Sequence, residues 1–196
     1  MNPDATFDCL FLADRLQAEA GDFAMAELHL FSYLACLLWL YGENAVADWG
    51  YAYVGTELGA PYSLDLDETI RRLEDSGYFM RFGPRLRMSP EVREQLVFFS
   101  GLEVNRQRSE CLYAATSSIA AFSIGIVNSA LSAEPELRRA RDFPSSRPLL
   151  EERARSKLYE QFDSLRFALT GTGSDLRLPA VIWLETLYRL HEVSAE

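Results

Sequence analysis

The sequence has 196 residues, of which 48% are hydrophobic and 12% aromatic, and its formal net charge at pH 7 is −10. This composition excludes an intrinsically disordered chain, because enough apolar surface is present to form a core. The acidic balance excludes a protein whose whole surface binds nucleic acid, so any contact with nucleic acid has to be local.

The first half of the chain begins with two predicted helices. Residues 7–19 have the pattern of a short amphipathic helix, and a break follows at Gly21 and Asp22. Asp22 is a suitable cap for a second helix over residues 23–41. That segment is apolar nearly all round, which is typical of a helix with neighbours on several sides.

Two further helices are predicted before the first strand. Residues 47–58 are rich in aromatic side chains and run into Gly59, which suits the position after a helix end. Asp65 and Glu68 resemble a capping box at the start of a helix over residues 64–76.

The segment after this helix predicts a β-hairpin. Apolar and polar residues alternate over residues 78–82 and again over 85–89, with Gly83 and Pro84 between them. A helix over residues 90–108 follows. Three of these four helices, the short hairpin and the helix after it predict a mainly α fold, a winged helix-turn-helix with a β-hairpin wing.

Residues 111–132 contain no charged side chain over 22 residues. The segment is long enough to span a bilayer, but seven of its residues are Ser, Thr or Asn, so a buried or partner-covered helix is favoured over a membrane span. The side chains predicted to form a protein interface are Leu112, Tyr113, Ile119, Phe122 and Ile126.

The rest of the chain predicts an all-α extension, with a loop over 133–148 and helices at about 149–170 and 179–193. We therefore divide the chain into a winged-helix domain with N-terminal helices, residues 1–108, and a C-terminal helical extension, residues 109–196. The extension is expected to pack on the first domain or on a partner.

The helix over 64–76 has five acidic residues against two arginines, which opposes insertion into a DNA groove. The wing is basic, and its arginines suit either a phosphate backbone or the carboxylates of a partner. The alternative is a charged edge hairpin that prevents aggregation. The candidate contact residues are Arg71, Arg72, Arg81, Arg85 and Arg87.

No catalytic or metal-binding motif is recognisable in the sequence. His29 and His191 have no partner residues at metal-ligand spacing, and Cys9, Cys36 and Cys111 form no CxxC pair. We predict a non-catalytic protein without cofactor, metal or small-molecule substrate. The widely spaced cysteines and the lack of a secretory signal in the first ten residues predict a cytoplasmic location.

A family resemblance extends over about residues 23–100. Residues 49–63, the acid-rich helix that ends in Leu73-Glu74-Asp75-Ser76-Gly77-Tyr78, and the wing Arg85-Leu86-Arg87 resemble the middle component of three-component ABC systems. Related Lamassu-type anti-phage or anti-plasmid defence operons pair such a small winged-helix subunit with an SMC-like ATPase and an effector.

The resemblance implies an accessory subunit that binds the ATPase near its heads or adjoining coiled coils, helps to restrain the effector and helps the complex to engage double-stranded DNA. Two alternatives stay open. One is a dimeric transcription regulator in which residues 111–132 and 179–193 form the dimer interface and the five arginines touch DNA. The other is an enzyme whose site is assembled from distant residues.

Overall fold

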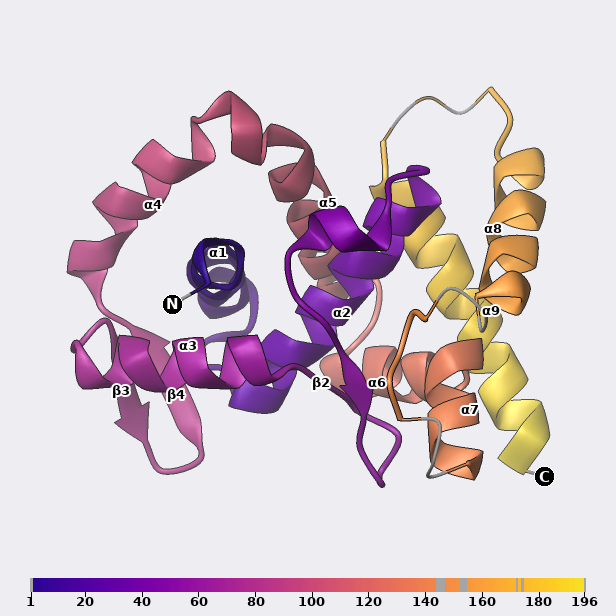
Figure 1. Ribbon diagram of the computed structural model, residues 1–196, viewed down its shortest axis with the longest axis horizontal. Helices are drawn as coiled ribbons and strands as arrows, with labels where there is room; N and C mark the ends of the chain where they lie inside the picture. Colours follow the sequence, from indigo (N-terminus) through magenta and orange to yellow (C-terminus); the bar gives the residue numbers. More distant parts are fainter. Residues whose placement is uncertain (1, 144–146, 152–154, 172, 174, 196) are drawn as a thin grey trace.

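The computed structural model describes residues 2–143, 147–151, 155–171, 173 and 175–195. The chain is mainly helical, which confirms the predicted class (Figure 1). The helices are α1 (Pro3–Ala20), α2 (Met25–Tyr41), α3 (Leu64–Asp75), α4 (Arg93–Ser100), α5 (Arg106–Ser117), α6 (Ile124–Ser132), α7 (Pro135–Asp142), α8 (Ser156–Ala168) and α9 (Arg177–Ala195), with short 3-10 helices η1 (Val46–Trp49), η2 (Pro90–Val92), η3 (Glu103–Asn105) and η4 (Ser118–Ala120). The strands are β1 (Val54–Gly55), β2 (Pro61–Tyr62), β3 (Phe79–Phe82) and β4 (Arg85–Met88).

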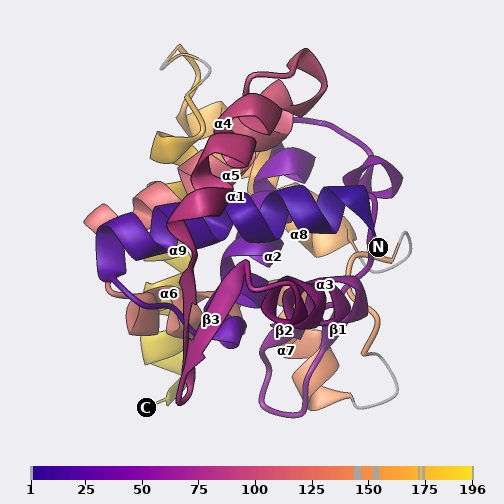
Figure 2. The ribbon, with the colours of Figure 1, turned by 90° about the vertical axis from the view of Figure 1, so that its left-hand side faces the viewer.

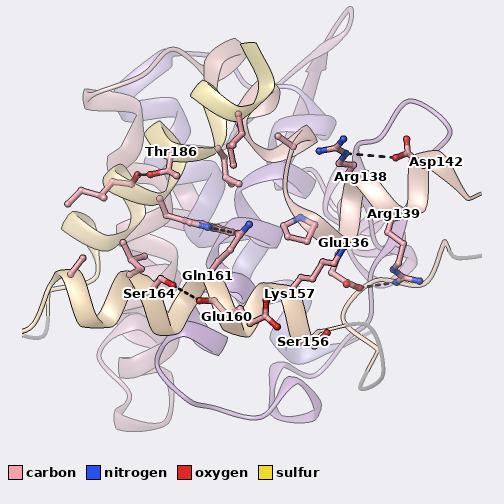
Figure 3. A pocket seen from close by; sticks show the side chains of 18 of the residues that line it. Glu136, Arg138, Arg139, Asp142, Ser156, Lys157, Glu160, Gln161, Ser164 and Thr186 are labelled. Carbon is pink, nitrogen blue, oxygen red and sulfur yellow. Dashed lines mark hydrogen bonds and ion pairs between the residues drawn. The ribbon is translucent and has the colours of Figure 1, made fainter. Parts of the chain in front are cut away.

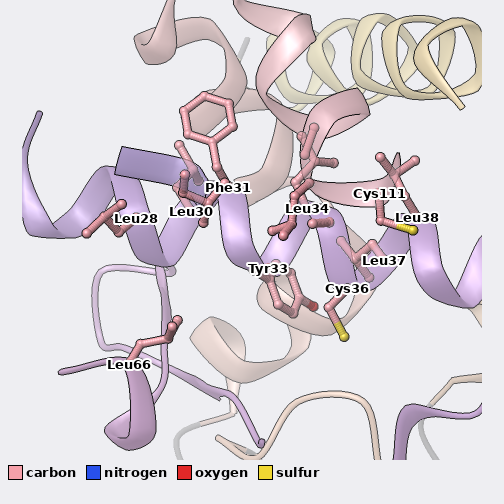
Figure 4. Close-up of a cluster of buried hydrophobic side chains, with 14 of the residues drawn as sticks. Leu28, Leu30, Phe31, Tyr33, Leu34, Cys36, Leu37, Leu38, Leu66 and Cys111 are labelled. Carbon is pink, nitrogen blue, oxygen red and sulfur yellow. The ribbon is translucent and has the colours of Figure 1, made fainter. Parts of the chain in front are cut away.

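Helix α2 is the centre of the core, as its apolar pattern predicts. Buried residues lie on every side of it, and it packs against α1, α3, α5, α6 and the β2 segment. Figure 4 shows its leucines, Phe31 and Tyr33 among buried side chains that include Leu66 of α3 and Cys111 of α5. The Glu27 carboxylate accepts a hydrogen bond from the backbone N–H of Ala24 at 2.9 Å and stabilises the start of the helix.

Helix α1 lies across this core and is anchored at both ends. The Asn2 side chain accepts hydrogen bonds from the backbone N–H groups of Asp4 and Ala5, and Pro3 occupies the first turn. The helix ends at Gly21, whose φ of 83° suits glycine. Figure 2 shows α1 along its length, with α4 on its outer side.

The predicted hairpin is confirmed by the antiparallel strands β3 and β4. Phe79 pairs with Met88 and Phe82 with Arg85. Phe23, in the link between α1 and α2, adds a bridge to β4: its N–H donates to the carbonyl of Leu86 at 3.0 Å, and the N–H of Leu86 donates back at 2.6 Å. The hairpin is thereby fixed to the N-terminal helices.

The prediction of a helix over residues 47–58 is wrong. Only η1 is helical there, and Gly50 follows it with a φ of 90°. The chain then runs extended to Gly55, whose N–H donates to the carbonyl of Arg147 at 2.7 Å. A Cβ atom at Gly55 would lie 2.5 Å from that of Ala140, so this close strand contact requires glycine.

The long helices predicted over 90–108 and 111–132 are each broken. The first is interrupted after α4 at Gly101, where Asn105 donates to the carbonyl of Phe99 at 2.9 Å. The second bends by 114° between α5 and α6. Serine explains this break, because the Ser118 hydroxyl bonds the backbone of Ala115 and Ser123 caps α6.

Two expected caps and one expected loop also differ from the structure. The Asp22 side chain pairs with the hairpin while Ala24 holds the N-cap position of α2, and Ser63 precedes α3 without a side-chain cap. The predicted loop over 133–148 contains α7, which begins at Pro135 with Glu134 as its cap.

The C-terminal helices α6, α7, α8 and α9 pack beside α2 and α5 (Figure 1). The expected helix at 149–170 appears as α8, with residues 152–154 outside the described part, and the expected helix at 179–193 appears as α9. The predicted domain boundary between residues 108 and 109 lies inside α5, which contacts α1, α2 and α9.

Candidate functional site

Each of the three arginines of the β3–β4 hairpin is bound to a carboxylate of its own chain. Arg81 makes two bonds to Glu74, at 2.6 and 2.7 Å, and Arg87 makes two bonds to Asp22, at 2.7 and 2.8 Å. Arg85 donates to Glu27 at 2.7 Å. The positive charge of the β3–β4 hairpin is therefore neutralised by carboxylates of α2, α3 and the link between α1 and α2.

The pairing of Arg87 with Asp22 shifts the pKa values of both side chains. Hydrogen bonds from Arg87 lower the pKa of Asp22, and the same bonds raise the pKa of Arg87. The guanidinium of Arg87 also lies over the ring of Phe82, at 4.8 Å from its centroid. A phosphate would have to compete with these bound carboxylates for the arginines.

Helix α3 presents mixed charge to solvent. Arg71 pairs with Asp67 of the preceding turn at 2.8 Å, and Arg72 is exposed. Glu68 and Asp75 are exposed carboxylates of the same helix, and Asp65 is half-buried. The structure thus brings the hairpin arginines and α3 to one region of the molecule, where each hairpin arginine is already paired with a carboxylate.

The five residues predicted to form a protein interface lie in different environments. Leu112 is fully buried in the chain's own core. Ile119, Phe122 and Ile126 are half-buried, and α6 packs closely on α9. Tyr113 is 40% exposed, and its ring lies under the guanidinium of Arg15, 4.7 Å from its centroid. Much of the uncharged stretch is therefore covered by the protein itself.

A buried ion pair joins α1 to α5. Asp8 is fully buried, and Arg108 donates to both of its carboxylate oxygens, at 2.6 and 2.7 Å. The Tyr51 hydroxyl donates to the same carboxylate. Burial alone would lower the pKa of Arg108, but the Asp8 carboxylate reverses this effect and the pKa lies above its ordinary value.

Aromatic side chains complete this network. The Arg108 guanidinium lies 4.0 Å from the centroid of the Trp49 ring. The Ser32 hydroxyl lies 2.6 Å from the hydroxyls of both Tyr51 and Tyr53, so helix α2 is linked to the same cluster. The polar groups of this cluster bond to each other inside the core, an arrangement suited to fixing the helices.

A second buried carboxylate caps α7. Glu134 accepts hydrogen bonds from the backbone N–H groups of Glu136 and Leu137 at 3.0 and 2.9 Å, and from the Tyr33 hydroxyl at 3.1 Å. Burial raises the pKa of Glu134 to about 7 against the opposing effect of these bonds. No sequence signal pairs Glu134 with Tyr33 or Asp8 with Arg108, because the two members of each pair lie about 100 residues apart.

The histidines and cysteines have structural surroundings. Burial lowers the pKa of His29 to about 4, and its Nδ1 accepts from the backbone N–H of Ser63 at 3.2 Å. Burial raises the pKa of all three cysteine thiols, that of Cys111 to about 12. Among the described residues, no group of three or more His, Cys, Asp and Glu side chains is arranged to hold a metal ion.

Helices α7, α8 and α9 line a groove that is open to solvent and has a volume of about 1150 Å³ (Figure 3). Its wall includes the buried indole of Trp183, which donates to Gln161 at 3.1 Å. On α7, Arg139 pairs with Glu136 at 2.9 Å, and Lys157 and Glu160 of α8 are exposed. The mixed lining shows no preference for an anion or a cation.

Exposed apolar side chains cluster on α4 and the following turn. We name this cluster the α4 surface: it consists of Val97, Phe98, Phe99, Leu102 and Val104. Val97 is 70% exposed, Phe98 67% and Val104 83%. This cluster was not predicted from the sequence, because in a continuous helix over 90–108 these residues would lie on several faces.

Among the described residues, no single helix is long and apolar enough to cross a membrane, and the one pair that meets the criteria together, 103–120 with 124–132, is bent by 114°. Comparisons of the chain with protein-family models, curated proteins and solved structures give no match.

Proposed function

We propose that the protein is a non-catalytic adaptor subunit that binds other proteins through a winged-helix module. The order of the main elements supports this fold: α1, the bridging residue Phe23, α2, α3 and then the β3–β4 hairpin, with Phe23 paired to β4, while η1, β1 and β2 lie between α2 and α3. Apart from these inserted elements a winged helix has the same order, with a short strand after its first helix that joins the wing. Helix α3 then corresponds to the recognition helix.

The observation on which the proposal depends is the pairing of the wing arginines with Glu74, Glu27 and Asp22. A DNA-binding wing needs cations that can displace counterions from phosphate. Here the cations are already neutralised within the chain, and α3 adds exposed carboxylates. Protein partners are therefore favoured over a duplex.

The complex that we propose is an SMC-like ATPase with its effector, in a defence system of the Lamassu type. The support is the resemblance of residues 23–100 to the middle component of such systems, together with the exposed apolar α4 surface, which calls for a protein contact. In this complex the subunit bridges ATPase and effector, and the double-stranded DNA is engaged mainly by the other subunits.

Co-expression with the proteins encoded by the neighbouring genes tests this proposal. The tagged chain is expected to purify in a stable complex with an ATPase and to remain bound through size-exclusion chromatography. A chain that elutes alone and as a monomer in the presence of these proteins would contradict the adaptor function.

Duplex binding by the isolated chain separates the adaptor from the DNA-binding regulator. At low salt, where electrostatic binding is strongest, we expect no retardation of a DNA duplex in a gel-shift assay. The variant Glu74→Gln with Asp22→Asn releases Arg81 and Arg87 and serves as the positive comparison: it is expected to bind duplex non-specifically. Sequence-selective binding by the unaltered chain would instead support the regulator.

A further inference from the structure

We propose that the α4 surface is the docking site for an amphipathic helix of a protein partner, with basic residues beside its apolar face. The proposal deepens the adaptor function and rests on it. Five large apolar side chains are exposed within eight residues, 97 to 104. Exposed apolar residues are ordinary when they are single, but five within eight consecutive residues indicate an interaction site.

Helix α4 contributes little to the chain's own core. Of its residues only Leu96 is buried, and the helix is held to α1 by this contact and by an ion pair of 2.8 Å between Arg93 and Asp14. Its opposite face bears Phe98, whose ring packs edge-on against Phe99 with the centroids 5.6 Å apart. Figure 2 shows that this helix lies at the outside of the molecule.

A small hollow lies between α1 and α4, next to the α4 surface. Its volume is about 220 Å³, and Phe11, Leu96 and Val97 form its apolar part. A cavity on the order of 150 Å³ holds a benzene ring, so one large apolar side chain of a partner fits here. A helix that docks in a groove uses such anchors at spacings of three and four residues.

The charge around the surface identifies the kind of helix. Glu91 and Glu94 are exposed and, within the described part of the chain, take part in no ion pair. The nearby cations are occupied, because Arg93 binds Asp14 and Arg106 binds Glu103 at 2.8 Å. The carboxylates are therefore available to Lys or Arg residues that flank the apolar face of a partner helix.

The same charges disfavour a second copy of this chain as the occupant. In a symmetric dimer the same patch meets itself, so Glu91 and Glu94 of both copies would be brought into one interface. Like charges placed together at an interface are unfavourable. The net charge of −10 adds to this repulsion.

A designed peptide tests the surface directly. The probe is a helical peptide of about 18 residues made of Leu and Lys at amphipathic spacing, and the matched control peptide has Glu in place of Lys. Fluorescence anisotropy with the full chain is expected to show binding of the Lys peptide and weaker binding of the Glu peptide. Replacing Val97→Ser and Phe98→Ser together is expected to weaken binding of the Lys peptide by about tenfold or more.

Two variants serve as comparisons. Phe167→Ser removes an aromatic side chain on α8 that is 85% exposed, and it is expected to leave binding unchanged. Glu94→Lys is expected to weaken binding of the Lys peptide and to improve binding of the Glu peptide. Circular dichroism and urea unfolding confirm that each variant is folded. Equal binding by all variants, or no binding of the Lys peptide, would overturn the assignment.

Co-purification with the neighbour-encoded proteins separates this proposal from the adaptor function. A complex that forms with the unaltered chain and is lost with Val97→Ser and Phe98→Ser supports both. A complex that persists with these substitutions keeps the adaptor function and overturns the α4 surface as its docking site. Light scattering tests whether a second copy of the chain occupies the α4 surface. A dimer that the same substitutions dissociate would show that it does and would overturn the proposed partner helix.

Discussion

Replacing Arg108 by methionine is expected to lower the free energy of unfolding by about 3–5 kcal/mol, because it leaves the Asp8 carboxylate alone in the core. Asp8 is fully buried, and Arg108 supplies two of its hydrogen bonds. Asp8→Asn leaves the buried guanidinium with only the more distant Asp4 carboxylate, at 3.8 Å, and is expected to cost a similar amount or somewhat less. Urea denaturation followed by circular dichroism measures both.

The control for Arg108→Met is a substitution of an exposed arginine on the same helix, α5. Arg106→Met removes an ion pair with Glu103 in which the two side chains are 69% and 80% exposed, so it is expected to cost less than about 1 kcal/mol. The double variant Asp8→Asn with Arg108→Met leaves no lone charge and is expected to lose less stability than the sum of the single variants. If Arg108→Met costs no more than Arg106→Met, the buried pair does not hold α1 to α5.

Glu134 is expected to make the protein less stable as the pH rises from about 4.5 to 7. Its pKa in the folded chain is raised to about 7 from an ordinary value of 4.5. Between these values the folded state holds a proton that the unfolded state releases, so unfolding becomes easier with rising pH. At about 1.4 kcal/mol for each pH unit, the loss amounts to at most about 3 kcal/mol.

Urea denaturation at a series of pH values checks this expectation. Glu134→Gln is expected to remove this contribution and to flatten the dependence between pH 5 and 7. Tyr33→Phe deletes a hydrogen bond that favours the charged carboxylate. It is therefore expected to raise the pKa of Glu134 further, so that the loss of stability continues to a higher pH. Glu57→Gln makes the same chemical change at a side chain that is 80% exposed, and it is expected to have little effect. An unchanged slope in Glu134→Gln would contradict the assignment.

Much of the N-terminal fold could be predicted from the sequence because its signals are local. The apolar surface of α2, the periodicity of α3 and the alternation around Gly83 each depend on neighbouring residues. The helix expected over 47–58 does not form for a physical reason: the helical backbone ends at Gly50, whose φ is positive, and Tyr51 and Tyr53 then fill the core from non-helical backbone.

The candidate sites could be predicted only in part. The basic wing was visible in the sequence, but the carboxylates that compensate it come from Glu74 and from Asp22 and Glu27, about 60 residues away from the wing. Tertiary packing alone brings such groups together. The α4 surface depends on the interruption at Gly101, and the charge-free stretch gave no indication that α2 and α9 of the same chain would cover it.

The three free cysteines provide a built-in reporter of opening. Cys9 belongs to α1, Cys36 to α2 and Cys111 to α5, and all three thiols are buried. A thiol-reactive dye therefore reaches them only when these helices separate, so its rate of reaction measures how often the central packing comes apart. Mass spectrometry of the adducts would tell whether the three helices separate in one cooperative event or one after another.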